Sequence, residues 1–313
     1  MANWDMQALM AKIETTYGTD SVPTGTVNAV LGQNVRYTPM EATEVKRQHA
    51  RPFQGNRPSM LVGKQARITF EVEAKASGTA GTPPAYGVFL RCCKCAEVIV
   101  PTTSVTYNGI SGNGDSCSIY FNVDGTLYKI IGARGTFQYK LNADGIVVIE
   151  FTMTGLFTLP VSQALPAVTY GSQMTEIPQV AVTENVPTFS IGAFAAAALR
   201  NFTFNKANEV KYRGLIGRRQ IILPTCAEAV EFQIEAEPLA TFNPFAIADS
   251  EAPQAISLVH GLGAGKVVTL TMPSVQILNP GDLANVDSVV ETQLRGSVLP
   301  TGNGNNQFTL AFT

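Results

Sequence analysis

Two short stretches far apart in the chain carry the same alternation of apolar and acidic residues. Residues 66–78 read ARITFEVEAKASG, and residues 229–241 read AVEFQIEAEPLAT. Because successive side chains of a β-strand point to opposite faces, each stretch predicts a strand with one apolar and one acidic face. Such an acidic face either meets solvent outside a domain or lines an enclosed channel. The candidates for a channel lining are Glu71, Glu73, Glu231, Glu235 and Glu237.

Short alternating runs separated by Gly, Asn and Pro dominate the rest of the chain, which is typical of β structure. Residues 117–157 contain two Asp-Gly turns, VDGT and ADGI, between apolar alternations and predict a β-meander. Helical spacing is rare. Residues 3–16 place apolar side chains at helical intervals and predict a short helix. Residues 82–98 begin with two prolines suited to a first helical turn and predict a helix covering a sheet.

Five segments of the first half recur in the same order in the second half. The pairs are 31–48 with 198–214, 66–75 with 229–237, 83–92 with 242–250, 125–141 with 265–279, and 152–160 with 292–300. We therefore predict a mainly β chain with two tandem β-sandwich or barrel domains, each flanked by a short α-helix. The expected division is a first domain over 1–164, a linker over 165–190 and a shorter second domain over 191–313.

The first domain contains a long basic arm at residues 40–64, for which the second copy shows no obvious counterpart. Residues 41–67 hold six lysines and arginines against two glutamates. A segment this long without its own structure is usually functional or disordered. We expect it to dock on an acidic surface of a neighbouring copy; nucleic-acid binding and a merely flexible loop are the alternatives. The candidate contact residues are Lys46, Arg47, Arg51, Phe53 and Arg57.

Composition narrows the function classes. Charged residues make up 15% of the chain, below the ~25% of ordinary soluble domains, which hints at surface buried in an assembly. The net charge of −2 gives no global field for a nucleic-acid ligand. A basic segment followed by an apolar run is missing at the N-terminus, and no apolar stretch is long enough to span a membrane. We therefore expect synthesis in a cytoplasm and no membrane insertion.

The sequence offers little catalytic chemistry. The CCKC run at 92–95 has no second Cys or His pair at metal-ligand spacing, so we expect reduced, structural thiols. His49 and His260 lie far apart, and GLGAGKVV at 261–268 departs from the phosphate-loop pattern. We accordingly expect no enzyme activity, no cofactor and no metal.

Several segments, taken in their order along the chain, resemble those of a known protein family. They include KIETTYGTDSVPTGTVNAVL, RPFQGN, FEVEAKASGTAGTPPAYGVFLRCC, SVTYNG, YFNVDGTLYKIIGARGTF, FTMTGLF and LPAVTY. Across essentially its whole length, the chain closely resembles the major tail tube protein of long-tailed, non-contractile bacteriophages.

The resemblance implies tail-tube-type β-sandwich domains, six of which close a ring whose strands join into an inner barrel. Rings stack into a hollow tube around the tape-measure protein, DNA later passes through the lumen, and terminator and tail-tip or baseplate proteins bind the ends. In this family a long loop, here residues 40–64, reaches the next ring. The implied location is the virion tail, assembled in the host cytoplasm.

Two domains per chain would let three chains form a pseudo-sixfold ring, with the acidic faces lining the lumen and repelling DNA phosphates. The alternative is a β-sandwich binding module, an adhesin or receptor-binding virion protein. Such a module would show exposed loops rich in aromatic residues, whereas Trp4 is the only tryptophan. An enzyme on a β scaffold would need a convergent carboxylate or histidine constellation.

Overall fold

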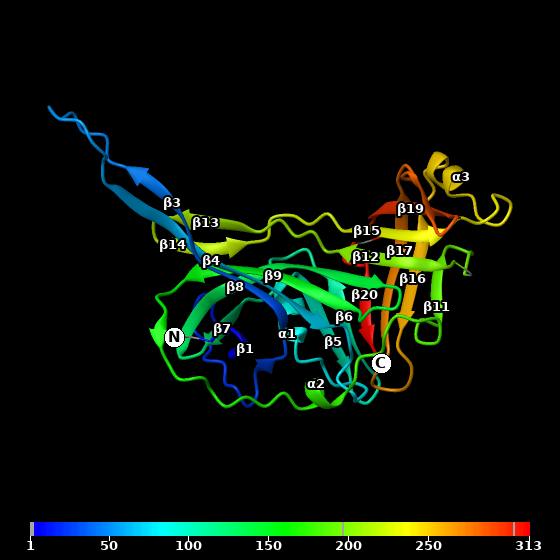
Figure 1. The fold of residues 1–313 in the computed structure, drawn as a ribbon, viewed down its shortest axis with the longest axis horizontal. Helices are drawn as coiled ribbons and strands as arrows, with labels where there is room; N and C mark the ends of the chain where they lie inside the picture. Colours follow the sequence, from blue (N-terminus) through cyan, green and yellow to red (C-terminus); the bar gives the residue numbers. More distant parts are fainter. Residues whose placement is uncertain (1–2, 196, 303) are drawn as a thin grey trace.

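The computed structural model describes residues 3–195, 197–302 and 304–313, and it is built mainly of antiparallel strands (Figure 1). The strands of the N-terminal half are β1 (Gln7–Ile13), β2 (Ala29–Val30), β3 (Gln33–Lys46), β4 (Ser59–Glu73), β5 (Cys95–Val100), β6 (Ser104–Gly109), β7 (Cys117–Val123), β8 (Thr126–Asn142), β9 (Val148–Phe157) and β10 (Val161–Ser162). The short helices α1 (Gly87–Cys92) and α2 (Ser172–Thr175) accompany them. The mainly β prediction is confirmed.

The C-terminal half contains a second set of strands and one short helix. Its elements are β11 (Thr188–Ile191), β12 (Leu199–Asn205), β13 (Lys211–Leu215), β14 (Arg218–Ile222), β15 (Ala229–Glu235), α3 (Pro244–Asp249), β16 (Gln254–His260), β17 (Val268–Ile277), β18 (Leu283–Val286), β19 (Val289–Val298) and β20 (Thr309–Phe312).

The two halves pair their strands in the same order. The first half runs β3–β4–β9–β8–β7–β1, and the second runs β12–β15–β19–β17–β16–β11. A register shift lies at the matching place in each, between Cys117 and Ile119 of β7 and between Gln254 and Ile256 of β16. This agreement supports the tandem repeat inferred from the sequence matches. The boundaries at residues 164 and 190 stay predictions.

The two half-sheets are joined into one sheet. Strand β12 pairs with β15 on one side and with β8 on the other, which gives the order β3–β4–β9–β8–β12–β15–β19–β18. A second connection forms at β20, which pairs with both β17 and β6. The halves are therefore linked by backbone hydrogen bonds along two separate seams (Figure 1).

One hydrophobic core extends through both halves beneath the joined sheet. Phe137 of β8 contacts Phe151 of its own half and Phe204 of the other half, with ring centroids 6.0 Å apart in each pair. Burying a side chain of this size contributes about 1.5–3 kcal/mol. The seam is thus held by apolar packing as well as by the strand ladder.

Each half contains a short helix, as predicted, and the two helices follow equivalent strands: α1 comes after β4 and α3 after β15. In α1, Phe89 is buried and packs against Phe70 of β4 with ring centroids 4.8 Å apart. Helix α3 begins with Pro244, and the Asn243 side chain accepts a hydrogen bond of 3.0 Å from the Ala246 backbone N–H. These are favourable residues for a helix start.

Two local predictions require correction, and one is confirmed. Residues 3–16 do not form a helix, because β1 spans Gln7–Ile13 and pairs with β7. Residues 8–11 are buried on both faces of this strand, and a strand covered on both faces imitates helical apolar spacing. The helix predicted over 82–98 is shorter, since α1 ends at Cys92 and β5 starts at Cys95. The meander over 117–157 is confirmed as β7, β8 and β9.

Candidate assembly surfaces

The face of the joined sheet that points away from the core is largely polar on its central strands. In one row Glu71 lies opposite Glu150, which lies opposite Gln138 on β8. In another row Thr203 of β12 lies opposite Glu231, which lies opposite Arg295 of β19. Across the seam, Asn205 of β12 lies opposite Gln138 and Thr203 lies opposite Lys140. The strand register therefore continues the polar face from one half into the other.

Of the five glutamates predicted to line a channel, only four lie together on the polar face. Glu71, Glu73, Glu231 and Glu235 lie on this polar face by strand alternation. Glu237 follows the end of β15 and, together with Glu235, lines an apolar groove beside α3.

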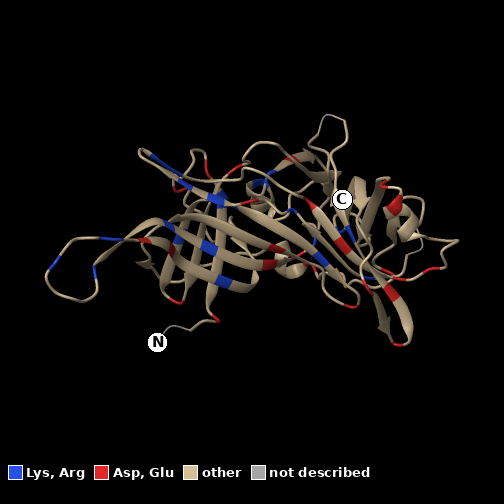
Figure 2. Cartoon of the chain, turned by 90° about the horizontal axis from the view of Figure 1, so that it is seen from above, with Lys and Arg blue, Asp and Glu red and all other residues tan. Residues whose placement is uncertain are grey.

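The polar face is mixed in charge rather than uniformly acidic (Figure 2). Lys140 binds Glu150 at 2.9 Å, and the Asn34 side-chain amide donates to Glu71 at 2.6 Å. Lys75 binds Glu73 at 2.5 Å. Sequence reasoning missed Lys140 and Glu150; the alternation of β8 and β9 was the signal that could have found them.

A buried carboxylate lies at the outer end of the same face. Arg200 forms an ion pair with Glu291, and the Gln233 amide donates to Glu291 at 2.7 Å. The hydrogen bond from Arg200 holds the pKa of Glu291 below its ordinary value. Glu291 is therefore a charged anchor of the sheet at neutral pH.

The predicted arm at residues 40–64 is the outer part of the β3–β4 hairpin, and it projects far from the body (Figure 1). It is not the segment without its own structure that the sequence led us to expect, because β3 extends to Lys46 and pairs there with β4, which starts at Ser59. The candidate residues Lys46, Arg47, Phe53 and Arg57 are exposed, and Arg51 is partly exposed. Arg51 lies 5.0 Å from the ring centroid of Phe53 and donates to the Asn56 carbonyl at 3.0 Å. Arg57 donates to the Gln48 side chain. The tip is thus folded on itself while its basic groups stay accessible.

A second, shorter hairpin occupies the corresponding place in the C-terminal half. Strands β13 and β14 lie between β12 and β15, just as the arm lies within the β3–β4 connection. The second copy therefore has a short counterpart of the arm in the same place, which the sequence comparison did not predict, but no long projecting arm. The hairpin was not predicted because its strands are short and turn at 216–217. The signals that could have found it are the Glu-Val-Lys sequence shared by residues 44–46 and 209–211, and the Arg218-Arg219 pair.

The shorter hairpin packs back onto the first half instead of projecting. Tyr212 lies under Gly63 of β4, where an added Cβ would be 3.5 Å from the tyrosine ring. The Ile221 N–H donates to the Tyr17 hydroxyl at 2.5 Å, and Arg134 donates to the Ile221 carbonyl at 2.8 Å. The hairpin is therefore an intrachain contact between the two halves.

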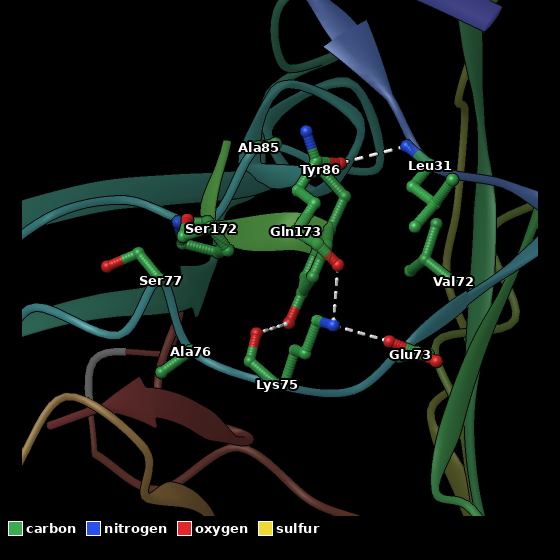
Figure 3. A pocket seen from close by; sticks show the side chains of 11 residues that line it. Leu31, Val72, Glu73, Lys75, Ala76, Ser77, Ala85, Tyr86, Ser172 and Gln173 are labelled. Atoms are coloured by element: carbon green, nitrogen blue, oxygen red, sulfur yellow. Dashed lines mark hydrogen bonds and ion pairs between the residues drawn. The ribbon is translucent and has the colours of Figure 1, made fainter. Parts of the chain in front are cut away.

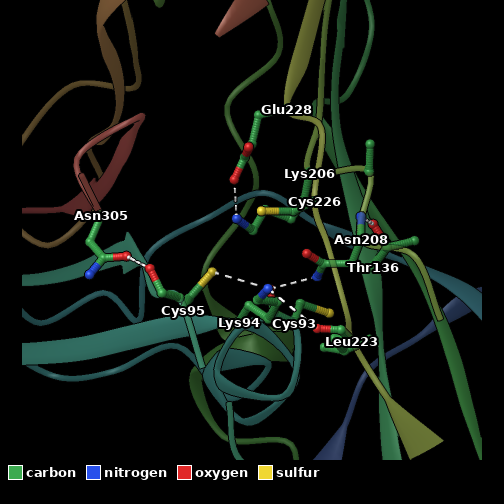
Figure 4. A network of polar contacts seen from close by, with 12 residues as sticks. Cys93, Lys94, Cys95, Thr136, Lys206, Asn208, Leu223, Cys226, Glu228 and Asn305 are labelled. Carbon is green, nitrogen blue, oxygen red and sulfur yellow. Dashed lines mark hydrogen bonds and ion pairs between the residues drawn. The ribbon is translucent and has the colours of Figure 1, made fainter. Parts of the chain in front are cut away.

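A buried polar network connects the halves around the CCKC run (Figure 4). The Asn208 amide donates to the carbonyls of Cys93 and Gly135 at 2.8 and 2.9 Å. Burial raises the pKa of the Cys93 thiol and raises that of Cys95 to about 12. Both of these thiols are therefore protonated at neutral pH, and all five cysteines are free. These features fit the structural role expected from the sequence.

The predicted linker is fastened to the first half at α2 (Figure 3). The Leu31 N–H donates to the Gln173 side chain at 2.8 Å, and the Lys75 ammonium donates to the Gln173 and Glu176 carbonyls at 2.8 and 2.7 Å. The small pocket beside these residues has a volume of about 30 Å³, which suits water rather than an organic ligand.

The two histidines, His49 and His260, lie in different environments. His49 is exposed on the arm, whereas His260 is buried and its Nε2 lies 2.8 Å from the Gln179 carbonyl. Within residues 3–195, 197–302 and 304–313, no group of three or more His, Cys, Asp or Glu side chains is placed to hold a metal ion. None of the helices in the described part of the chain is long and apolar enough to cross a membrane.

The joined sheet ends in two open edges. Among the described residues, β3 pairs with β4 alone and β18 pairs with β19 alone. Exposed edges promote pairing with another chain, and a closed ring removes them. Open edges of this kind are typical of structural proteins that assemble edge to edge. Residues 4–302 match the sequence model of a family described as phage tail tube protein, so the chain belongs to that family. No curated protein matches the chain.

Proposed function

We propose that three copies of this chain close a ring with six β domains, and that such rings stack into the hollow tube of a phage tail. The observation that supports this most directly is the seam between β8 and β12, because it joins two repeated half-sheets edge to edge. The edges at β3 and β18 are left for other copies. Three chains joined in this way form a pseudo-sixfold ring without open edges.

The polar face of the sheet would line the lumen, because the opposite face is occupied by the core. Its threonine, asparagine and glutamine side chains, with the glutamates at 71, 73, 231 and 235, offer few unpaired cations to DNA phosphates. Non-specific DNA affinity rests on cation–phosphate contacts, so DNA would pass without sticking. The tape-measure protein would occupy the lumen before DNA, and terminator and tail-tip proteins would bind the tube ends.

The arm would connect successive rings. It extends from one end of the strands, where its basic residues lie, and acidic residues lie at the other end (Figure 2). Asp144 is in the turn between β8 and β9, and Asp287 is in the turn between β18 and β19. Head-to-tail stacking therefore brings unlike charges together.

Electron microscopy of the purified chain at high concentration tests the proposal. Class averages down the axis are expected to show hollow rings with three chains and six lobes, or tubes built from them. Absence of rings and tubes both for the chain alone and with tail-tip components added would overturn it.

A further inference from the structure

An apolar groove opens at the free β18 edge, beneath α3. It has a volume of about 190 Å³, and its lining includes Leu239, Phe245, Leu283 and Val290. Leu283 is 62% exposed and Val290 is 48% exposed, although both point to the face of the sheet that elsewhere packs on the core. Apolar side chains gathered at an open edge mark a surface for a partner.

The same positions are buried in the first half. Across the central strands, Val72 lies opposite Ile149, which lies opposite Tyr139. In the second half Ile234 lies opposite Thr292, which lies opposite Leu283. Leu283 is thus the counterpart of Tyr139, and Val290 is the counterpart of Val147. Tyr139 and Val147 are each only 1% exposed.

Strand β12 is what covers Tyr139. Tyr139 lies opposite Phe204, and its ring centroid is 6.5 Å from that of Phe202. The counterpart of β12 in the first half is β3, because Tyr37 lies opposite Ile68 just as Phe204 lies opposite Val230. In the part of the chain that the structure describes, no strand pairs with β3 on this side.

Strand β11 and the residues just before it also lie beside this part of the first half. Phe189 of β11 and the preceding Val186 line a crevice there together with Leu141 of β8. The matched registers of β1–β7 and β11–β16 make Met6 the counterpart of Val186. Met6 is 45% exposed.

From these correspondences we infer that the groove beneath α3 receives the β3 edge and Met6 of a second copy of this chain. Strand β18 pairs antiparallel with the second copy's β3, so that Leu283 lies opposite Tyr37 and Ala284 lies opposite Arg36. The inference rests on the proposed ring and specifies its contact between chains. Within one chain the halves are also joined by the pairing of β6 with β20. The contact between chains has no such second pairing, because the described part of the second half has no strand equivalent to β6: α3 leads directly to β16, the counterpart of β7. The contact between chains therefore depends on the groove and the paired edge.

Paired cysteines test the register. Ala284→Cys with Arg36→Cys places the two thiols directly opposite, within disulfide reach, whereas Ala284→Cys with Thr38→Cys places them on the diagonal at ~7–8 Å. Oxidised assemblies of the first variant are expected to yield covalent dimers and trimers on non-reducing gels, at least about tenfold more than the second variant. The unsubstituted chain gives the background from the five natural thiols.

The outcomes separate this inference from the proposed function. Rings seen by electron microscopy without the in-register crosslink, or with the diagonal crosslink favoured, would overturn the groove assignment and leave the tube function standing. Absence of rings from every variant and from the unsubstituted chain, with tail-tip components present, would overturn both.

A charge in the groove gives a second, independent readout. Leu283→Glu is expected to remain a folded monomer with an unchanged thermal midpoint, because the side chain is already exposed, and to lose ring formation. Leu159→Glu is the matched control, since Leu159 is 76% exposed and lies outside the groove. Normal rings from Leu283→Glu would contradict the inference.

Discussion

Lys206 and Glu228 form an ion pair that is almost entirely buried at the seam between the two halves of the chain (Figure 4). The Lys206 ammonium also lies 5.0 Å from the ring centroid of Phe308. Two charges taken out of water at this place are tolerated only because each neutralises the other.

We predict that Lys206→Met lowers the free energy of unfolding by about 3–5 kcal/mol, because it leaves the Glu228 carboxylate buried without a partner. The double variant Lys206→Met with Glu228→Leu is expected to recover most of that loss. Urea unfolding of the three proteins measures both effects. A single variant as stable as the natural chain would show that the pair is not buried in solution.

We predict that the arm is needed for the stacking of rings but not for the closure of a ring. Arg51→Glu combined with Arg57→Glu reverses two charges at an exposed tip, so the protein should stay soluble and folded and should still close rings. Those rings should fail to stack, because the reversed tip is repelled by the acidic turns of the next ring. Tube length in negative-stain images measures this.

The matched control for the arm is Lys12→Glu, which reverses an exposed charge on β1, away from the arm. Tubes of ordinary length from the double arm variant would contradict inter-ring docking. Short tubes from both variants would point instead to a general effect of net charge.

The parts of this fold that could be predicted from sequence are those in which one face of a strand is covered. Residues 66–73 and 229–235 alternate visibly because one side meets the core and the other does not. Strand β1 was missed because both of its faces are covered, and the β13–β14 hairpin because its strands are short. Local periodicity carries no information about either circumstance.

The candidate surfaces were harder to predict because they depend on pairing between distant segments. Glu71 and Glu150 are opposite neighbours only through the β4–β9 register, and the mixed charge of the polar face follows from that register. Likewise, the groove at Leu283 becomes visible only when its exposure is compared with that of Tyr139.

Lumen charge is predicted to control the passage of DNA. Glu231→Lys with Glu235→Lys replaces two exposed carboxylates on the polar face by cations, so assembled tubes should retain DNA at low salt and release it as salt rises. The control is the DNA retention of tubes that carry Glu251→Lys, which changes an exposed residue after α3. Equal retention by both tubes, or a ring map with the polar face on the outer wall, would refute the lumen assignment.

Stability is predicted to fall in mildly acidic solution because of His260. Burial lowers the pKa of His260 in the folded chain, so the unfolded chain binds the proton more readily. This contribution is fully present above the unfolded value of about 6.5 and is lost as the pH falls through the folded pKa. The expected slope is at most about 1.4 kcal/mol per pH unit. His260→Gln can keep a hydrogen bond to the Gln179 carbonyl but does not titrate, so its unfolding free energy should vary less between pH 7 and pH 5. If the natural chain and His260→Gln show the same pH dependence in urea unfolding, the histidine is not the titrating group.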